Sequence, residues 1–94
     1  MPRIAFIGAG SLLFSRRLMI DILTFPELRD STFALMDIDP KRLDYAHRVA
    51  ERVLREGDFP ATVEATTDRR EALKDADYVV VMILVGGVEA IYPD

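Results

Sequence analysis

Short apolar runs alternate with segments of helical periodicity along this chain, and that alternation restricts the fold more than any other feature of the sequence. Apolar runs bounded by turn residues are typical of strands that are buried on both faces of a parallel sheet. Between them, apolar residues recur at helical spacing, and Asp39 followed by Pro40 is a strong helix start. Strands are expected at 4–7, 32–36, 61–66 and 78–85. Helices are expected at 11–25, at 40–56 with Gly57 as the stop, and at 68–74 with Asp68 as the N-cap.

The order β-α-β-α-β-α-β predicts an α/β fold, because strand–helix–strand units join parallel strands by right-handed crossovers. We expect a parallel sheet of strand order 3-2-1-4, which is the first half of a Rossmann-like, doubly wound sheet. Residues 1–94 are therefore expected to form one truncated half-domain that lacks the catalytic region.

Charge and composition exclude several functional classes. A net charge of −4 provides no electrostatic basis for binding nucleic acid or an anionic membrane. The chain has no cysteine and only one histidine, His47, so we expect no metal site within it. The N-terminus leads directly into strand-like sequence without the features of a signal peptide, and the apolar run at 79–88 is too short to span a bilayer. We expect a cytoplasmic protein.

The turn Gly8-Ala9-Gly10-Ser11 follows the first expected strand and opens the first expected helix. A diphosphate needs close backbone approach, which glycine permits, and N–H donors, which a helix N-terminus supplies. The third glycine position of the dinucleotide fingerprint is Leu13, so the motif is incomplete and could be an ordinary tight turn. Its placement between strand and helix favours a phosphate-binding turn.

Asp37 ends the second expected strand. A carboxylate at this position accepts hydrogen bonds from the adenosine ribose hydroxyls and repels a 2′-phosphate, so it favours NAD over NADP. Asp37 could also simply end the strand while Asp39 caps the next helix, and both can hold. Together with the glycine turn, Asp37 predicts a dinucleotide site.

Two further positions lie at strand ends, where ligands bind in such sheets. Gly86 and Gly87 could let the backbone approach the nicotinamide-side ribose, although a flexible turn explains this pair equally well. Thr66 could line the adenine side of the site, or could cap the following helix.

The chain resembles glycoside hydrolase family 4, whose members include α-galactosidases, α-glucosidases, α-glucuronidases and 6-phospho-glycosidases. The motifs that carry the resemblance are Gly-Ala-Gly-Ser-x-x-Phe ending at Phe14, Asp-Ile-Asp from Asp37 to Asp39, and the late Val-Gly-Gly. The resemblance extends over nearly the whole chain, through stretches 4–14, 21–23, 34–43, 65–68, 76–79 and 85–90. It implies that Phe14 and Asp39 belong to the NAD site.

The resemblance also implies the chemistry of a glycosidase that depends on NAD and a divalent metal ion. In this family, bound NAD transiently oxidises the sugar at C3, which makes the C2–H acidic, and a divalent metal ion, typically Mn²⁺, stabilises the resulting enediolate. The leaving group is then eliminated, water adds, and NADH reduces C3 again, so the net reaction is hydrolysis. The family's metal ligands and catalytic base lie beyond Asp94, so we expect no catalytic or metal-binding residue here and no activity of this chain alone. The small carbohydrate substrate would bind to the longer protein.

The same turn indicates the substrate branch. Members that act on phosphorylated sugars usually have Gly-Gly-Gly-Ser-x-Tyr-Thr at this turn, whereas this chain has Gly-Ala-Gly-Ser-Leu-Leu-Phe. Those members also usually have a basic residue a few places after the later glycine pair, where this chain has Ile91 and Tyr92. We therefore expect activity on non-phosphorylated α-glycosides, in particular α-galactosides. The alternatives are a fragment of a 2-hydroxy-acid dehydrogenase, or a stand-alone module that binds a nucleotide or self-associates. We also expect a homo-oligomer, because the fourth strand would be an apolar sheet edge.

Overall fold

The computed structural model describes residues 2–10 and 12–82, and for residues 12–14 the backbone only. The elements follow the expected order, with a short 3-10 helix, η1, added after the first helix. They are β1 (Arg3–Ile7), α1 (Leu12–Leu23), η1 (Pro26–Leu28), β2 (Thr32–Met36), α2 (Pro40–Glu56), β3 (Thr62–Thr66), α3 (Arg69–Leu73) and β4 (Tyr78–Val81).

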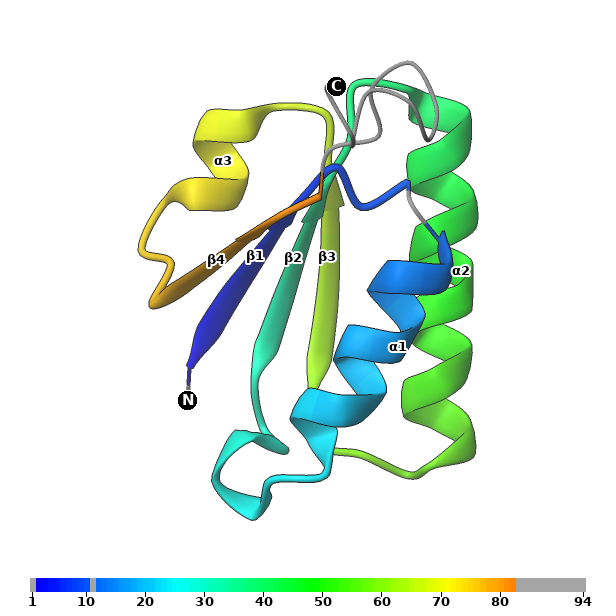
Figure 1. The fold of residues 1–94 in the computed structure, drawn as a ribbon, viewed down its shortest axis with the longest axis vertical. Coiled ribbons are helices and arrows are strands. Elements are labelled where there is room, and N and C mark those ends of the chain that lie inside the picture. The colour runs from blue at the N-terminus through cyan, green and yellow to red at the C-terminus, as the bar shows by residue number, and fades with distance from the viewer. Residues whose placement is uncertain (1, 11, 83–94) are drawn as a thin grey trace, which may run out of the picture.

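The four strands form one parallel sheet of order β3-β2-β1-β4, which confirms the predicted fold class and strand order (Figure 1). β1 lies between β2 and β4, with Ala5 paired to Ala34 on one side and to Val79 on the other. All strands point the same way, so their carboxyl ends meet at one edge of the sheet.

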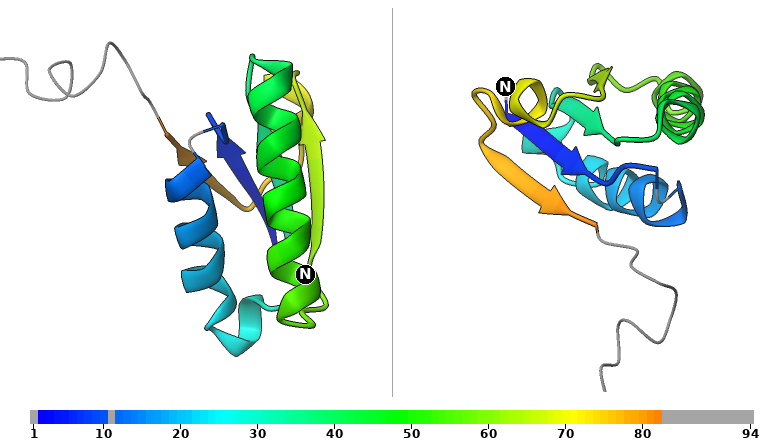
Figure 2. Two further views of the ribbon diagram at one scale, coloured as in Figure 1. Left: turned by 90° about the vertical axis from the view of Figure 1, so that its right-hand side faces the viewer. Right: turned by 90° about the horizontal axis from the view of Figure 1, so that it is seen from above.

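The helices divide between the two faces of the sheet (Figure 2). α1 and α2 cover one face, where the rings of Phe6 and Phe33 meet edge to face with their centroids 5.8 Å apart. α3 covers the other face, where Ala72 packs against Ala34 and Met36. Because side chains alternate along a strand, both faces of β1 and β2 are buried, which explains why these strands read as uninterrupted apolar runs.

Two helix starts have the predicted caps. The Asp39 carboxylate accepts hydrogen bonds from the N–H groups of Lys41 and Arg42 at the start of α2, and the Asp68 carboxylate accepts from the Arg70 N–H at the start of α3. Each such cap stabilises its helix by about 1 kcal/mol.

The helix ends differ in detail from the prediction. α1 ends at Leu23 rather than residue 25, because Phe25 precedes Pro26 and is extended, with φ −89° and ψ 120°. Gly57 follows α2 as predicted, but the left-handed residue is Asp58, with φ 52°. A Cβ on Gly57 would collide with the ring of Phe59 unless that ring shifted.

β4 is an edge of the sheet within the described residues, since it pairs only with β1. Its side chains Tyr78, Val79 and Val81 are 59%, 49% and 58% exposed. The strand ends at Val81, and the expected continuation at 83–85 lies outside the described residues. Among residues 2–10 and 12–82, no helix has the length and apolar character needed to cross a membrane.

Candidate functional site

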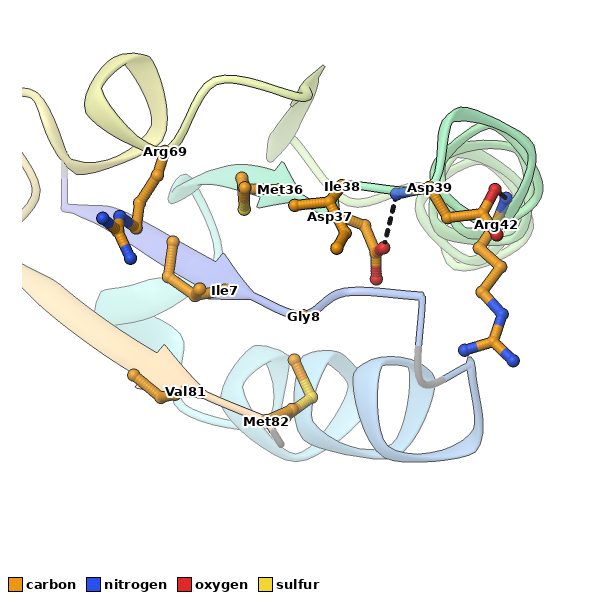
Figure 3. A pocket seen from close by; sticks show the side chains of 10 residues that line it. All are labelled: Ile7, Gly8, Met36, Asp37, Ile38, Asp39, Arg42, Arg69, Val81 and Met82. Carbon is orange, nitrogen blue, oxygen red and sulfur yellow. Dashed lines mark hydrogen bonds between the residues drawn. The ribbon is translucent and has the colours of Figure 1, made fainter. Parts of the chain in front are cut away.

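A pocket of about 480 Å³ opens at the carboxyl ends of β1, β2 and β4 (Figure 3). This is the edge at which doubly wound sheets bind their ligands, and the volume falls in the range of small-molecule sites. The lining combines an apolar floor with two carboxylates and two guanidinium groups, from Ile7, Gly8, Met36, Asp37, Ile38, Asp39, Arg42, Arg69, Val81 and Met82.

The glycine turn after β1 is bound tightly to the neighbouring strands. The N–H groups of Gly8 and Ala9 both donate to the carbonyl oxygen of Met36, each at 2.8 Å. Gly8 has φ +86°, and a Cβ on it would overlap the backbone carbonyl of Met82, so only glycine fits this position. The N–H groups of Gly8 and Ala9 are therefore used in hydrogen bonds to β2, and a bound anion would need other donors, such as the first N–H groups of a helix.

Asp37 links this turn to the start of α2. One carboxylate oxygen, Oδ2, accepts the N–H of Gly10 at 2.8 Å, and the other, Oδ1, accepts the N–H of Asp39 at 2.9 Å (Figure 3 draws the latter). A Cβ on Gly10 would lie 2.5 Å from Oδ2 and 2.9 Å from the Cβ of Arg42. The glycine thus allows the backbone to approach the carboxylate of Asp37.

A carboxylate offers about four acceptor sites, so Asp37 keeps two after these hydrogen bonds. Asp37 lines the pocket and is only partly buried. A ribose presents two adjacent hydroxyl donors, and the remaining acceptor capacity matches them. The residues present therefore fit the adenosine ribose of a dinucleotide.

Ser15 supports the turn from beneath. Its side chain is buried, and its hydroxyl donates to the carbonyl oxygen of Ala9 at 2.8 Å and contacts the sulfur of Met82 at 3.7 Å. The hydrogen bond to Ala9 links the turn to α1, and the contact with Met82 links α1 to the segment after β4.

The structure assembles part of the predicted site. Gly8, Asp37 and Asp39 line the pocket, and Gly10 is hydrogen-bonded to Asp37, with Ala9 buried in the same turn. Thr66 ends β3 and pairs with the pocket residue Met36, but it does not line the pocket itself. It lines a separate hollow with Arg3 and Glu64, and its hydroxyl accepts the N–H of Asp68 at 3.0 Å. Ser11, the side chain of Phe14, Gly86 and Gly87 lie outside the described residues.

Seven of the ten pocket residues were not predicted as site residues, and Ile38, Arg42 and Arg69 are three of them. From the sequence, the two arginines were interpreted as parts of solvent-exposed helix faces. Arg42 lies in the first turn of α2, the helix that follows β2, and Arg69 begins α3, the helix that follows β3. Segments at the carboxyl ends of parallel strands surround the ligand, but this signal does not distinguish Arg69 from the adjacent Arg70. The side chain of Ile38 is 83% exposed.

No group of three or more histidine, cysteine or acidic side chains in residues 2–10 and 12–82 is placed to hold a metal ion.

Comparison with known proteins identifies relatives of this fold and site. The family described as family 4 glycosyl hydrolase matches residues 3–94. An α-galactosidase of Rhizobium meliloti is 45% identical over 92 residues, which are 98% of this chain and 19% of that protein. An α-galactosidase of Bacillus subtilis is 39% identical over 87 residues, 93% of this chain and 20% of that protein.

Among solved structures, a 6-phospho-α-glucosidase from gut microorganisms, in complex with NAD and glucose-6-phosphate, is similar. Its TM-score is 0.79 at 26% identity, and the match covers 92% of this chain and 20% of that one. The chain thus spans about a fifth of the length of the proteins that it matches.

Proposed function

Because this chain belongs to glycosyl hydrolase family 4, we propose that it is the NAD-binding N-terminal part of a glycosidase that uses NAD and Mn²⁺. The proposed substrates are non-phosphorylated α-glycosides, in particular α-galactosides. Family membership over residues 3–94 also weighs against the 2-hydroxy-acid dehydrogenase alternative.

The position of the Asp37 carboxylate is the main support for the proposed NAD site. It stands at the end of β2, hydrogen-bonded to the glycine turn and facing a pocket at the carboxyl edge of the sheet. A negative charge with free acceptor capacity binds a ribose diol and disfavours a 2′-phosphate. We therefore propose NAD rather than NADP as the cofactor.

When bound, NAD would supply reversible hydride transfer at sugar C3. The residues of this chain would bind and orient its adenosine half: Asp37 through the ribose hydroxyls, and the turn at Gly8 and Gly10 by allowing close backbone approach. None of the described residues is proposed to act on the sugar.

The relatives support the proposed substrate class. The α-galactosidases share 45% and 39% of their aligned residues with this chain, whereas the solved 6-phospho-α-glucosidase shares 26%. The turn Gly-Ala-Gly-Ser-Leu-Leu-Phe also differs from the glycine-rich turn that is usual in enzymes for phosphorylated sugars.

The proposal is tested on the protein made from its whole natural reading frame. NAD should bind in a calorimetric titration, and an aryl α-galactoside should be hydrolysed only when NAD and Mn²⁺ are both present. The matched 6-phosphorylated substrate should be a poor one. Preference for the phosphorylated substrate would refute the substrate class, and activity without NAD would refute the cofactor role. The 94-residue chain alone should be inactive under the same conditions.

A further inference from the structure

We propose that Arg69 stacks its guanidinium on the adenine base of the bound cofactor, across from Ile38, in the part of the pocket beside Asp37. This inference rests on the proposed NAD site and names the residues that would bind its adenine end. Neither Arg69 nor Ile38 was assigned to the NAD site from the sequence.

The pocket has the lining that a flat aromatic base requires. Its floor is apolar, formed by Ile7, Met36 and Val81 at the ends of three neighbouring strands. Ile38 enters from the connection between β2 and α2, and Arg69 enters from the start of α3 (Figure 3). Covering the 83%-exposed side chain of Ile38 with a base would remove apolar surface from water, which is favourable.

The position of Asp37 indicates which end of the cofactor lies here. A ribose held through its 2′- and 3′-hydroxyls carries its base on the adjacent C1′ atom, so the base lies within one sugar ring of the carboxylate. Figure 3 shows Asp37 between Arg42, at one end of the pocket, and Arg69, at the other. The phosphate-binding turn approaches Asp37 through Gly10, whose Cα lies next to the Cβ of Arg42. The base therefore extends toward Arg69.

The backbone position of Arg69 is fixed because both ends of α3 are anchored. The Arg3 guanidinium donates from Nε to the carbonyl oxygen of Lys74 at 2.9 Å and pairs with Glu64 at 2.9 Å, which ties the end of α3 to β1 and β3. Asp68 caps the start of the helix immediately before Arg69. Within residues 2–10 and 12–82, Arg69 itself takes part in no ion pair, so its guanidinium is available to a ligand.

The surroundings of Arg69 favour stacking over phosphate binding. Figure 3 shows its side chain beside Ile7 and away from the turn that would receive the diphosphate. A guanidinium is planar and weakly hydrated, and it binds an aromatic face with about 0.5–2 kcal/mol, depending on how far the pair is desolvated.

The test uses the protein made from its whole natural reading frame and measures binding of three probes: NAD, AMP and nicotinamide mononucleotide. Arg69→Ala should weaken NAD and AMP by the same factor, about two- to thirtyfold from the strength of a cation–π contact, and should leave the mononucleotide unchanged. Arg69→Tyr, which offers an aromatic face, should restore binding of NAD and AMP. Arg70→Ala removes the neighbouring exposed arginine of the same helix and should leave all three affinities unchanged.

Three results would overturn the inference. If wild-type protein binds NAD and AMP but Arg69→Ala binds them equally well, the adenine subsite is wrong while the NAD site stands. If Arg69→Lys retains full affinity and the loss in Arg69→Ala vanishes at high salt, Arg69 binds a phosphate instead. If the wild-type protein binds neither NAD nor AMP, the proposed function fails together with the inference.

Discussion

The backbone N–H of Gly10 donates a hydrogen bond to the carboxylate Oδ2 of Asp37 at 2.8 Å. This contact joins the turn after β1 to the end of β2, two segments that are separated by the whole of α1. It places the proposed ribose-binding carboxylate against the proposed phosphate-binding turn, so a change at either residue should affect the other.

Asp37→Ala should weaken NAD binding by about tenfold or more, because hydrogen bonds to a charged group each contribute about 1.5–3 kcal/mol. NADP should lose less affinity, since the same change removes repulsion of its 2′-phosphate. Calorimetric titration of both cofactors into the whole protein measures the difference. Asp44→Ala, on the exposed face of α2 and paired with Arg48, is the matched control. Equal losses for NAD and NADP would refute the role of Asp37.

Gly8→Ala should destabilise the fold by at least about 1 kcal/mol, because alanine is disfavoured at φ +86° and its Cβ would overlap the Met82 carbonyl. Thermal unfolding should show a decrease in Tm of about 4 °C or more. Gly8→Asn separates the two causes, because asparagine tolerates positive φ but still carries a Cβ. Full stability in Gly8→Asn would show that the overlap is relieved and that only the backbone angle matters.

Asp75→Gly should raise the free energy of unfolding by about 0.5 kcal/mol. Asp75 adopts φ 60° after α3, where a residue with a Cβ is strained and glycine is not. Asp75→Ala serves as the control and should give no gain, since alanine carries the same strain. Chemical denaturation measures both. A glycine variant no more stable than the alanine variant would contradict the prediction.

The isolated 94-residue chain should self-associate through β4. Val79 and Val81 are 49% and 58% exposed on a strand that pairs only with β1 among the described residues, and an apolar edge is a template for pairing with another chain. Sedimentation equilibrium at tens of micromolar should give a mass near that of a dimer, and Val81→Lys should shift it toward the monomer. A wild-type mass of 10.6 kDa would show that the edge does not pair.

Local sequence was sufficient to predict the elements and their order. Helix caps such as Asp39 and Asp68 act on N–H groups two or three residues away, and the apolar runs of β1 and β2 show burial on both faces directly. The strand order followed because right-handed crossovers leave few arrangements of such units. The glycine turn and Asp37 were identifiable for the same reason, since each has a fixed place at the end of a strand.

Contacts between distant segments were decided only by the tertiary structure. The sequence could not show that Gly8 and Ala9 both donate to Met36, or that the Thr66 hydroxyl binds the Asp68 N–H and lines a separate hollow. It could not distinguish Arg69, which lines the pocket, from Arg70 beside it, which does not. Sequence patterns record which residues are neighbours along the chain and on one face of an element. Which side chains meet across the sheet edge depends on how strands pair and where each helix packs, and those distances exist only in the folded molecule.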